Sequence, residues 1–382
     1  MGLFINPGND SFRQARNSEI YVDKSGLIAY TNKVLETEQK YICVSRPRRF
    51  GKSMAANMLA AYYDKSCDSE SLFAQLSIAK ECSYKEQLNQ SSVLYLDIAW
   101  FYNTAVDEKQ VVTFLQKMVI EELRTIYPEC LAKEECSLSM ALAKINAQTA
   151  EKFIIIIDEW DYLFREKQKE TNLQEEYISF LRGLFKGAPA NRFVKLAYMT
   201  GVLPIKKYGT QSALNNFDEF TMVNAEPLAE YVGFTEDEVF ALCQKYQMNR
   251  EETKRWYDGY VLGELHSLYS PRSVVKAMTL RQFGDYWTQT DTYEMLRRYI
   301  DMNFDGLKDS IIQMLGGGKC RINPQKFQND MTNLKSKDDV MTLLIHLGYL
   351  AYDSRTREVY IPNQEIADEF ANAIEDLGWD KL

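Results

Sequence analysis

A run of four isoleucines constrains the fold of this chain more than any other feature. Residues Phe153–Glu159 read FIIIIDE, an unbroken apolar stretch that ends in two carboxylates. A strand that is apolar at every position is buried on both faces, which is typical of a parallel sheet covered by helices on both sides. The segment therefore predicts the central strand of an α/β sheet, with Asp158 and Glu159 at its carboxyl end.

Strands alternate with helices through about the first 225 residues. Further short apolar segments that read as strands are Tyr41–Val44, Ser92–Phe101 and Arg192–Gly201. Segments with helical periodicity lie between them, including Ser53–Tyr63 and Glu108–Tyr127. Alternating strands and helices with buried strands predict an α/β fold, a doubly wound parallel sheet.

The pattern changes after residue 225. Thr235 with Glu238 three positions later forms a helix-capping box, and helical segments continue to about residue 330. The last stretch reads as a helix, a glycine stop at Gly348, a hairpin around Asp353–Thr356 and a final helix, an order that resembles a winged-helix unit. The predicted division is an α/β domain, a helical lid domain and a winged-helix-like C-terminal unit, at residues 1–225, 226–330 and 331–382.

The segment that follows the first strand reads SRPRRFGKS, Ser45–Ser53. A loop between a buried strand and a helix directs backbone N–H groups and the helix N-terminus at phosphate. Gly51 allows close approach, Lys52 would reach the β- and γ-phosphates of a nucleotide, and the Ser53 hydroxyl would ligate Mg²⁺. The usual pattern begins with glycine where this chain has Arg46, so the loop alone leaves a plain basic turn as an alternative.

Every residue of this loop is a candidate for nucleotide binding: Arg46, Pro47, Arg48, Arg49, Phe50, Gly51, Lys52 and Ser53. The three arginines would attract a triphosphate or contact nucleic acid, and the first interpretation is favoured because it needs nothing beyond the loop. Pro47 fixes φ and would stiffen a loop that lacks its first glycine.

The acidic end of the isoleucine strand supplies a second nucleotide motif. Asp158 would hold Mg²⁺, and Glu159 would polarise the attacking water as general base. The next strand ends at Thr200, which either contacts the γ-phosphate and the water or caps the following turn. Each motif is weak alone, but Lys52 and Asp158 in this order predict a P-loop nucleotide site for ATP and Mg²⁺.

Three other segments invite a functional reading. The run GGGK at Gly316–Lys319 follows a helical segment with no strand before it, so a helix stop is favoured over a second phosphate loop. Trp256 and Tyr257 would stack on a base or pack in the core of the lid, and the core is favoured. His346 lies on an apolar helical face and is interpreted as a packed core residue.

Composition narrows the partners and the compartment. The net charge of −9 disfavours a protein that coats nucleic acid by charge. No run approaches the roughly 20 apolar residues of a membrane span, and no signal peptide is visible. The seven scattered cysteines have no CxxC spacing, which disfavours zinc and fits reduced thiols in the cytoplasm. From position 331 onward ten acidic residues outnumber five basic ones, which disfavours contact of this unit with nucleic-acid phosphates. The basic residues are Lys335, Lys337, Arg355, Arg357 and Lys381.

The order of several short motifs resembles the bacterial AAA-ATPase-like family. The motifs are YVDKS, RPRRFGKS, IIDEWD, MTGV, GFTEDEV, WYDGY, HLGYL and YIPNQEI, between about residues 12 and 375. The resemblance implies an ATP-binding P-loop domain, a helical lid and a winged-helix-like unit. In that family RPRRFGKS is the usual form of the loop, so Arg46 is the expected residue.

Many members of the family continue into a PD-(D/E)XK nuclease domain. The last hundred residues of this chain contain no aspartate followed at suitable spacing by Glu-x-Lys, so no nuclease is assigned to it. Trp160 replaces the usual tyrosine and keeps an aromatic ring. Arg272 stands where the family often has tryptophan, so no role is transferred to it, and no arginine finger is identified.

The favoured hypothesis is an enzyme, a slow Mg²⁺-dependent ATPase in which Lys52, Glu159 and Thr200 serve catalysis and Ser53 and Asp158 hold the metal. Hydrolysis would be coupled to a conformational switch of the lid and the C-terminal unit. The alternative is a nucleotide-gated regulatory module with little turnover that controls a partner or a nuclease. Besides ATP and ADP, a protein partner or self-association is expected, whereas nucleic acid and membrane are not.

Overall fold

The computed structural model describes the chain except for residues 209–210, 288–291, 303, 305 and 377–382. The chain divides into two compact units. Unit 1 comprises Met1–Val44, Lys52–Gly201 and Ile205–Glu219, and unit 2 comprises Ser45–Gly51, Val202–Pro204 and Phe220–Leu382. The segment Ser45–Gly51 thus has most of its contacts with unit 2, although it is joined by the chain to unit 1 at both ends.

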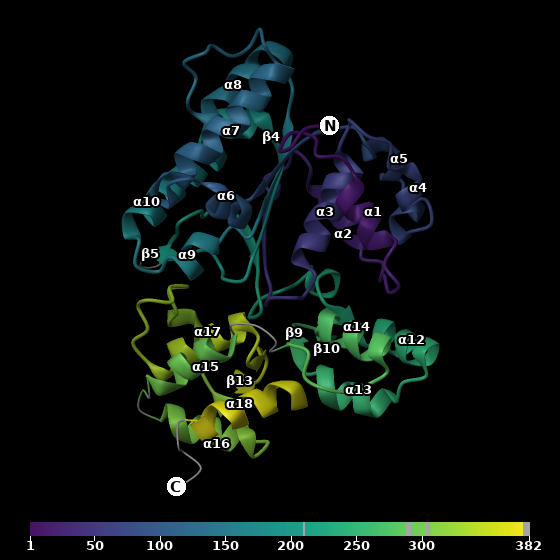
Figure 1. The fold of residues 1–382 in the computed structure, drawn as a ribbon, viewed down its shortest axis with the longest axis vertical. Helices are drawn as coiled ribbons and strands as arrows, with labels where there is room; N and C mark the ends of the chain where they lie inside the picture. Colours follow the sequence, from purple (N-terminus) through teal and green to yellow (C-terminus); the bar gives the residue numbers. More distant parts are fainter. Residues whose placement is uncertain (209–210, 288–291, 303, 305, 377–382) are drawn as a thin grey trace. The chain divides into compact units, whose positions relative to one another are not determined.

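The main sheet has five strands in the order β2-β3-β4-β1-β7 (Figure 1). Their bounds are β1 Tyr41–Ser45, β2 Ser92–Asp97, β3 Phe153–Asp158, β4 Val194–Gly201 and β7 Asp218–Phe220. Strand β3 pairs in parallel with β2 and β4, and all six of its residues are buried. The predicted α/β fold is confirmed. Strand β4 lies between β1 and β3, so the strand before the loop and the strand with the acidic motif are not neighbours.

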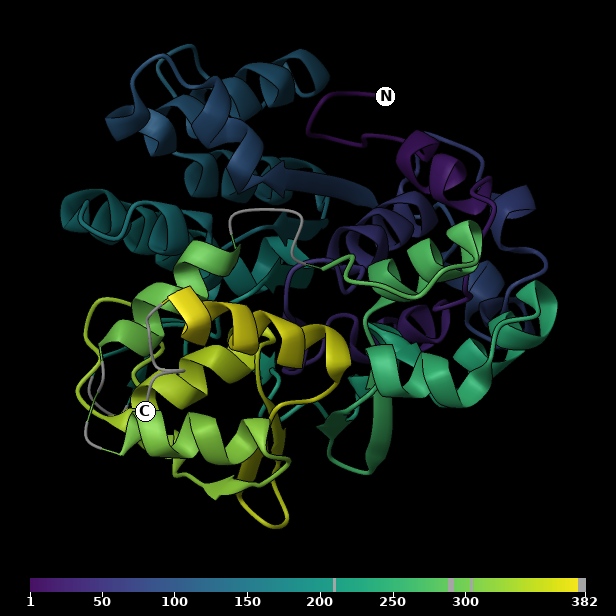
Figure 2. The same ribbon diagram turned by 60° about the horizontal axis from the view of Figure 1, so that its bottom comes forward.

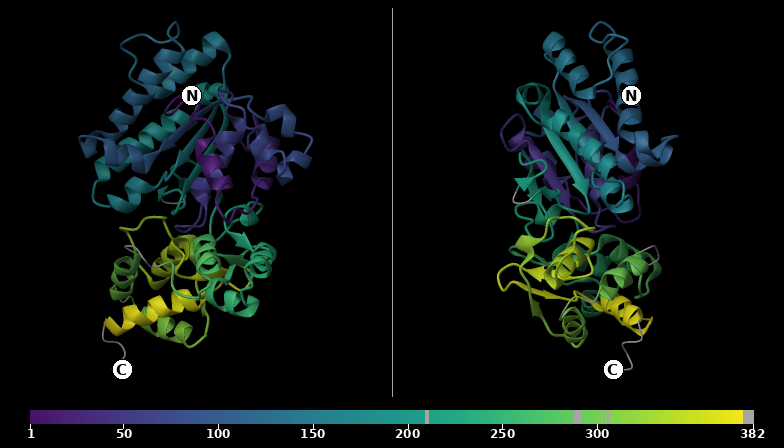
Figure 3. Two further views of the ribbon diagram at one scale, coloured as in Figure 1. Left: turned by 45° about the vertical axis from the view of Figure 1, so that its right-hand side comes forward. Right: turned by 90° about the vertical axis from the view of Figure 1, so that its left-hand side faces the viewer.

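Helices cover both faces of this sheet. Helices α1, α2 and α3 lie on one side and α6, α7, α8 and α10 on the other, in agreement between Figures 1 and 3. The helices of unit 1 are α1 Asp10–Arg16, α2 Gly26–Val34, α3 Lys52–Tyr63, α4 Glu70–Phe73, α5 Tyr84–Gln87, α6 Ile98–Thr104, α7 Val111–Ile126, α8 Leu138–Thr149, α9 Tyr162–Glu166, α10 Thr171–Phe185 and α11 Ala188–Phe193, with 3-10 turns η1 Ser77–Lys80 and η2 Glu108–Gln110. A continuous apolar core joins strands β1–β4 to helices α6, α7, α8 and α10.

The second predicted strand is shorter than its sequence suggested. Strand β2 ends at Asp97, whose carboxylate accepts a hydrogen bond from the Trp100 N–H at 2.9 Å and caps helix α6. The apolar run continues to Phe101 because α6 is itself buried at Ile98 and Phe101. The apolar pattern alone therefore could not locate the boundary between a buried strand and the buried helix that follows it.

The region predicted as a helical lid contains a small sheet as well as helices. Its elements are β8 Phe234–Thr235, α12 Glu236–Tyr246, α13 Arg250–Tyr257, β9 Tyr260–Leu262, β10 Leu265–Tyr269 and α14 Pro271–Leu280, with 3-10 turn η3 Ala229–Tyr231; short strands β5 Lys207–Tyr208 and β6 Gln211–Ser212 belong to unit 1. The capping box of Thr235 and Glu238 is confirmed at the start of α12. Strands β8, β10 and β9 form an antiparallel sheet, and Gly263 with φ +62° lies in the turn of its hairpin. The sequence signal for this hairpin was that glycine between two apolar segments.

The C-terminal part has the predicted order of elements. They are α15 Thr292–Asp301, α16 Leu307–Leu315, β11 Cys320–Arg321, η4 Pro324–Lys326, α17 Lys337–Leu347, β12 Ala351–Asp353, β13 Glu358–Tyr360 and α18 Gln364–Asp376. Helix α18 packs on α15 and α16 (Figure 2). Helix α17 ends at Gly348 with φ +92°, and β12 and β13 form the expected antiparallel hairpin. Lys381, part of the charge count above, lies outside the described residues.

Two further predictions for unit 2 are confirmed. Helix α16 ends at Gly316, and the Gly317 and Gly318 N–H groups donate to carbonyls of its last turn, so GGGK is a helix stop. His346 is 3% exposed and stacks on Phe327. Residues 226–330 and 331–376 fall in one compact unit, and their separation into a lid and a C-terminal unit stays a prediction. Among the helices that the structure describes, none combines the length and apolar character that crossing a membrane requires.

Candidate nucleotide-binding site

Lys52 is the first residue of helix α3 and carries a buried ammonium group. Lys52 is only 5% exposed, and this burial lowers the pKa of its ammonium group to about 8. The nearby carboxylate of Glu159 opposes this shift, with smaller contributions of the same sign from Asp161 and Asp158. Ser53 follows on the exposed side of the helix. The helix N-terminus thus lies close to the acidic end of β3.

Asp158 is 3% exposed and is held by three hydrogen bonds. Its Oδ1 accepts from the Thr200 hydroxyl and from the Glu159 N–H at 3.0 Å, and its Oδ2 accepts from the Tyr95 hydroxyl at 3.2 Å. Burial and the charge of Asp158 raise the pKa of Tyr95, so this hydroxyl stays a donor. Within the described residues, no three His, Cys, Asp or Glu side chains form a metal site by themselves.

Thr200 lies beside the candidate metal ligand. It is fully buried at the end of β4, and its hydroxyl donates to Asp158. Such a hydrogen bond restricts the rotation of the carboxylate. The contact with the γ-phosphate and the alternative cap on the following turn both stay predictions.

Glu159 is paired with an arginine that the sequence reasoning missed. Glu159 follows β3 with φ +54°, and its carboxylate forms an ion pair with Arg165 of helix α9. The Arg165 side chain is 2% exposed and also pairs with Asp161 at 3.0 Å. Burial would lower the pKa of Arg165, but Asp161 and Glu159 outweigh it and raise the pKa. The only sequence signal was the spacing of Asp161 and Arg165, four positions apart in a helical stretch.

The ends of β3 and β4 approach closely at a glycine. The Trp160 N–H donates to the Thr200 carbonyl at 2.9 Å, and Trp160 is 1% exposed. A Cβ atom at Gly201 would lie 2.6 Å from Asp161 Oδ1 and from ring atoms of Trp160. The glycine of the MTG motif is therefore needed because no side chain fits between these two strand ends. The aromatic ring at position 160 fills the same tight junction.

Two of the loop arginines are committed to backbone carbonyls of unit 2. Arg46 is fully buried, and its Nη1 donates to the carbonyls of Ser45 at 2.9 Å and Phe220 at 3.0 Å. Arg49 Nη1 donates to the carbonyls of Tyr286 at 2.8 Å and Trp287 at 2.6 Å. These two guanidinium groups thus bind carbonyl oxygens, and the attraction of a triphosphate by the three arginines stays a prediction.

The backbone of the loop leaves room for an anion. Gly51 has φ +94°, and a Cβ atom there would meet no atom of the described chain within 4 Å. Arg49 has φ +70°. Turns that include left-handed residues bring successive backbone N–H groups into an anion-binding concavity. Open space beside Gly51, directly before Lys52, is what a bound phosphate requires.

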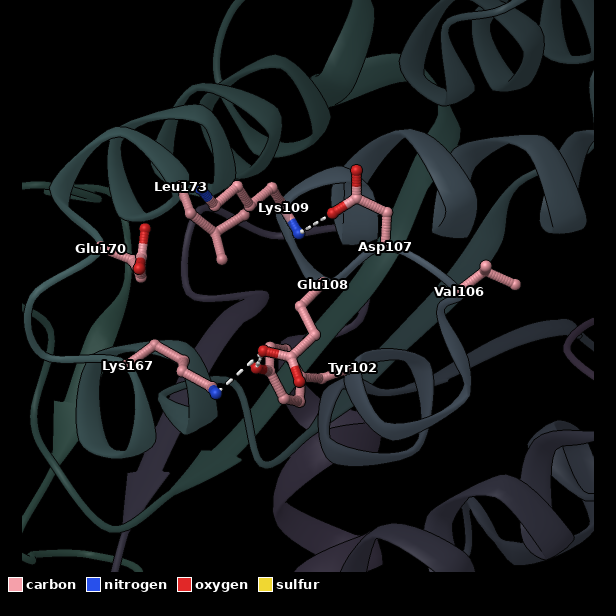
Figure 4. Close-up of a pocket in the computed structure, with 8 residues that line it drawn as sticks. All are labelled: Tyr102, Val106, Asp107, Glu108, Lys109, Lys167, Glu170 and Leu173. Atoms are coloured by element: carbon pink, nitrogen blue, oxygen red, sulfur yellow. Dashed lines mark hydrogen bonds and ion pairs between the residues drawn. The ribbon is translucent and has the colours of Figure 1, made fainter.

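Unit 1 also has a pocket whose lining includes none of the candidate nucleotide-binding residues. It has a volume of about 320 Å³ and is lined by Tyr102, Val106, Asp107, Glu108, Lys109, Lys167, Glu170 and Leu173 (Figure 4). Lys167 and Glu108 point toward one another across it, with Nζ and Oε2 at 2.9 Å, and the Tyr102 hydroxyl also donates to Glu108. These polar groups satisfy one another, so the pocket suggests no ligand.

The sheet order, the loop between β1 and α3 and the acidic end of β3 define an α/β protein of the P-loop ATPase class. Residues 7–210 match the family model described as Predicted AAA-ATPase, and the chain belongs to this AAA-ATPase-like family. This confirms the resemblance seen in the motifs. A curated relative from Azotobacter chroococcum mcd 1, described as an uncharacterized protein in the vnfD 5' region, is 24% identical over 292 residues. The match covers 75% of this chain and 54% of the relative, so this chain spans about half the relative's length.

Solved structures resemble the chain only distantly. The Aeropyrum pernix ORC2 protein in ADPNP–ADP complexes has a TM-score of 0.41 and 11% identity, covering 96% of this chain and 98% of that one. AMPPCP-bound DnaA from Aquifex aeolicus has a TM-score of 0.34 and 10% identity, covering 96% and 92%. The family assignment rests on the family model.

Proposed function

We propose that this chain binds ATP with Mg²⁺ at the loop Arg46–Ser53 and hydrolyses it slowly to ADP and phosphate. The observation that carries the proposal is the buried ammonium of Lys52 beside the acidic end of β3. Burying a charge is costly unless opposite charges or hydrogen bonds face it, and a triphosphate would add to the negative charge that Glu159 already places near Lys52. Membership of a family described as Predicted AAA-ATPase supports the same function.

The geometry supports the following binding roles. Lys52 and the backbone N–H groups around Gly51 bind the β- and γ-phosphates. Ser53 and Asp158 are the residues that would hold Mg²⁺, which when bound would neutralise charge on those phosphates. Thr200 keeps the Asp158 carboxylate in a fixed orientation through its hydrogen bond.

Glu159 is the proposed general base for hydrolysis. It accepts a proton from water while the water oxygen bonds to the γ-phosphorus and the bond from that phosphorus to the β,γ-bridging oxygen breaks, releasing ADP. The ion pair with Arg165 competes with this role, because the carboxylate has to turn from the guanidinium to accept a proton from water. Slow turnover is therefore expected.

The same ion pair favours a second candidate function. If Glu159 stays paired with Arg165 when nucleotide binds, the chain is a nucleotide-gated regulatory module with little turnover, controlling a partner or a nuclease. Both functions predict that MgATP raises the melting temperature by stabilising the folded state. Only the ATPase predicts release of phosphate above background.

The test is phosphate release and MgATP-dependent melting for the wild type, Lys52→Ala and Glu159→Gln. Lys65→Ala is the matched control, because Lys65 forms an exposed ion pair with Glu151. The ATPase predicts that Lys52→Ala loses binding and that Glu159→Gln binds but loses turnover by about 100-fold or more. Equal phosphate release from wild type and Glu159→Gln would exclude hydrolysis by this base.

Coupling of the nucleotide to unit 2, action in the cytoplasm and a protein partner or self-association complete the proposal. The net charge of −9 continues to disfavour nucleic acid as a general ligand. The coupling is supported by the assignment of Ser45–Gly51, most of the phosphate loop, to unit 2. A change in the hydrogen exchange of unit 2 on adding MgATP would be its direct measure.

A further inference from the structure

The backbone of the phosphate loop departs from ordinary geometry at a residue that is not glycine. Arg49 has φ +70°, in the left-handed region that side chains disfavour, and lies in a turn with Arg48. Gly51, two residues later, also has a positive φ. The loop therefore relies on a left-handed arginine two residues before its glycine, and another interaction is needed to hold that arginine in place.

The Arg49 side chain supplies that interaction within unit 2. Its Nη1 donates to two successive carbonyls, those of Tyr286 and Trp287, at 2.8 and 2.6 Å. Trp287 is 2% exposed and packs edge-on against Tyr349 with ring centroids 5.0 Å apart. One of the two carbonyls that bind the guanidinium thus belongs to a buried residue whose ring is packed against another aromatic ring.

A buried carboxylate fixes the same two peptide units from their other side. Glu365 is 1% exposed, and its Oε1 accepts from the N–H groups of Tyr286 at 2.7 Å and Trp287 at 3.0 Å. Glu365 thus accepts hydrogen bonds from the N–H groups of Tyr286 and Trp287, the same two residues whose carbonyls accept from Arg49. The same two peptide units donate to Glu365 and accept from Arg49, so the hydrogen bonds from Glu365 to Arg49 form one network.

The loop residues on either side of Arg49 are also anchored in unit 2. A Cβ atom at Gly348 would lie 2.7 Å from Pro47 Cβ, so the two residues are in close contact. Phe50 is 1% exposed and packs edge-on against Tyr260 at 5.3 Å, and the Tyr260 hydroxyl donates to the Gly348 carbonyl at 2.6 Å. These contacts restrict the loop just before and just after the strained residue.

We propose that Arg49 is a positioning residue of the phosphate loop rather than a phosphate ligand. Its side chain, held through Tyr286, Trp287 and Glu365, keeps the loop backbone in the left-handed turn that directs N–H groups at the phosphates. The inference rests on the proposed nucleotide binding and deepens it, because it identifies how unit 2 sets the affinity of the loop.

Three substitutions of Arg49 separate positioning from direct contact. Glycine adopts φ +70° without strain, whereas alanine does not, and neither can donate a side-chain hydrogen bond. Lysine keeps the positive charge. Positioning predicts that Arg49→Gly binds MgATP about fivefold or more tightly than Arg49→Ala, given the usual cost of a left-handed non-glycine residue. Direct contact predicts that Arg49→Gly and Arg49→Ala bind equally weakly and that Arg49→Lys binds best.

Glu365→Ala extends the test to a residue on the far side of the network. Positioning predicts that it weakens MgATP binding and that its effect is not additive with Arg49→Ala, as expected for members of one network. Binding is measured by calorimetry on the full chain, with circular dichroism to establish folding. If Glu365→Ala does not fold, the ratio between Arg49→Gly and Arg49→Ala decides alone.

The outcomes for this inference and for the proposed function are distinct. Wild-type binding that is lost in Lys52→Ala, with Arg49→Gly tighter than Arg49→Ala, supports both. The same dependence on Lys52 with equal affinities for Arg49→Gly and Arg49→Ala overturns the positioning role alone. Absence of binding that depends on Lys52 in the wild type overturns the proposed function and the inference with it.

Discussion

Replacing Lys52 with methionine is expected to stabilise the protein in the absence of nucleotide. Burial lowers the pKa of Lys52 from 10.5 to about 8, and the attraction of Glu159 is already contained in that value. At about 1.36 kcal/mol per pKa unit, holding this ammonium in the folded protein at neutral pH costs about 3 kcal/mol. Methionine has a similar length and no charge, so Lys52→Met removes the cost and keeps most of the packing.

The assay is thermal unfolding at pH 7 without nucleotide and then with saturating MgATP. For unit 1, which has a size where about 1 kcal/mol shifts the melting temperature by 2–4 °C, a rise of roughly 6–12 °C is expected for Lys52→Met. Added MgATP should then raise the melting temperature of the wild type but not of the variant, because the variant lacks the phosphate-binding charge.

The pH dependence gives an independent check on the sign. Between pH 8 and 10.5 the folded wild type has released the Lys52 proton while the unfolded chain still holds it. The free energy of unfolding rises with pH wherever the unfolded state binds more protons. Across this range the wild type should therefore become more stable relative to Lys52→Met as the pH rises. Below pH 8 the difference between the two proteins should be constant and in favour of the variant.

A second buried lysine provides the matched control. Lys40 is 6% exposed, and its ammonium donates to the carbonyls of Asn191 at 3.1 Å and Val194 at 2.9 Å. Lys40→Met would leave those carbonyls without this donor and should lower stability. If Lys52→Met is also less stable than the wild type at pH 7, the claim that the buried Lys52 ammonium is retained at the expense of stability is refuted.

Three further predictions concern the acidic end of β3 and the start of helix α12. Arg165→Met should lower the free energy of unfolding by about 3 kcal/mol in urea, because the buried Asp161 loses its counter-ion. Gly201→Ala should cost about 2 kcal/mol in the same assay, since its Cβ would lie 2.6 Å from Asp161 Oδ1. Gly183→Ala is the control: Gly183 lies in helix α10, its Cβ would lie 3.6 Å from the nearest atom, and the substitution should be neutral or stabilising. Thr235→Ala should cost about 1 kcal/mol of stability by removing the N-terminal cap of helix α12, measurable as a lower melting temperature.

The sequence was sufficient to predict features whose cause is local. Continuous β-branched residues identified β3 as a strand buried on both faces, and the glycine-lysine-serine step identified the start of α3. The capping box at Thr235 and the glycine stop at Gly348 were equally readable, because caps depend on residues within one turn.

Features whose cause is distant in the chain could not be predicted. Nothing around Arg49 indicates that its guanidinium donates to carbonyls 237 and 238 residues away. A cluster of positive charge beside a phosphate loop is equally compatible with binding an anion or with binding carbonyl oxygens. Likewise, no property of Thr200 distinguishes a hydroxyl that meets a phosphate from one that orients Asp158. These choices are made by tertiary contacts, which local patterns do not contain.

The same distinction explains why Arg46 replaces the first glycine of the standard loop. Arg46→Gly would recreate the standard pattern, yet it should not improve nucleotide binding, because the Arg46 guanidinium is fully buried and donates to the Phe220 carbonyl at 3.0 Å. We expect the variant to lose about 3 kcal/mol of stability in urea unfolding, from lost packing and a carbonyl deprived of this donor. Its affinity for MgATP, measured by calorimetry at a temperature where it is folded, should be equal to or weaker than that of the wild type. Tighter binding by Arg46→Gly would mean that the arginine only obstructs a standard loop. Weaker binding would mean that the buried Arg46 side chain holds the loop backbone where its N–H groups can reach the phosphates. In the standard loop the first glycine allows that approach.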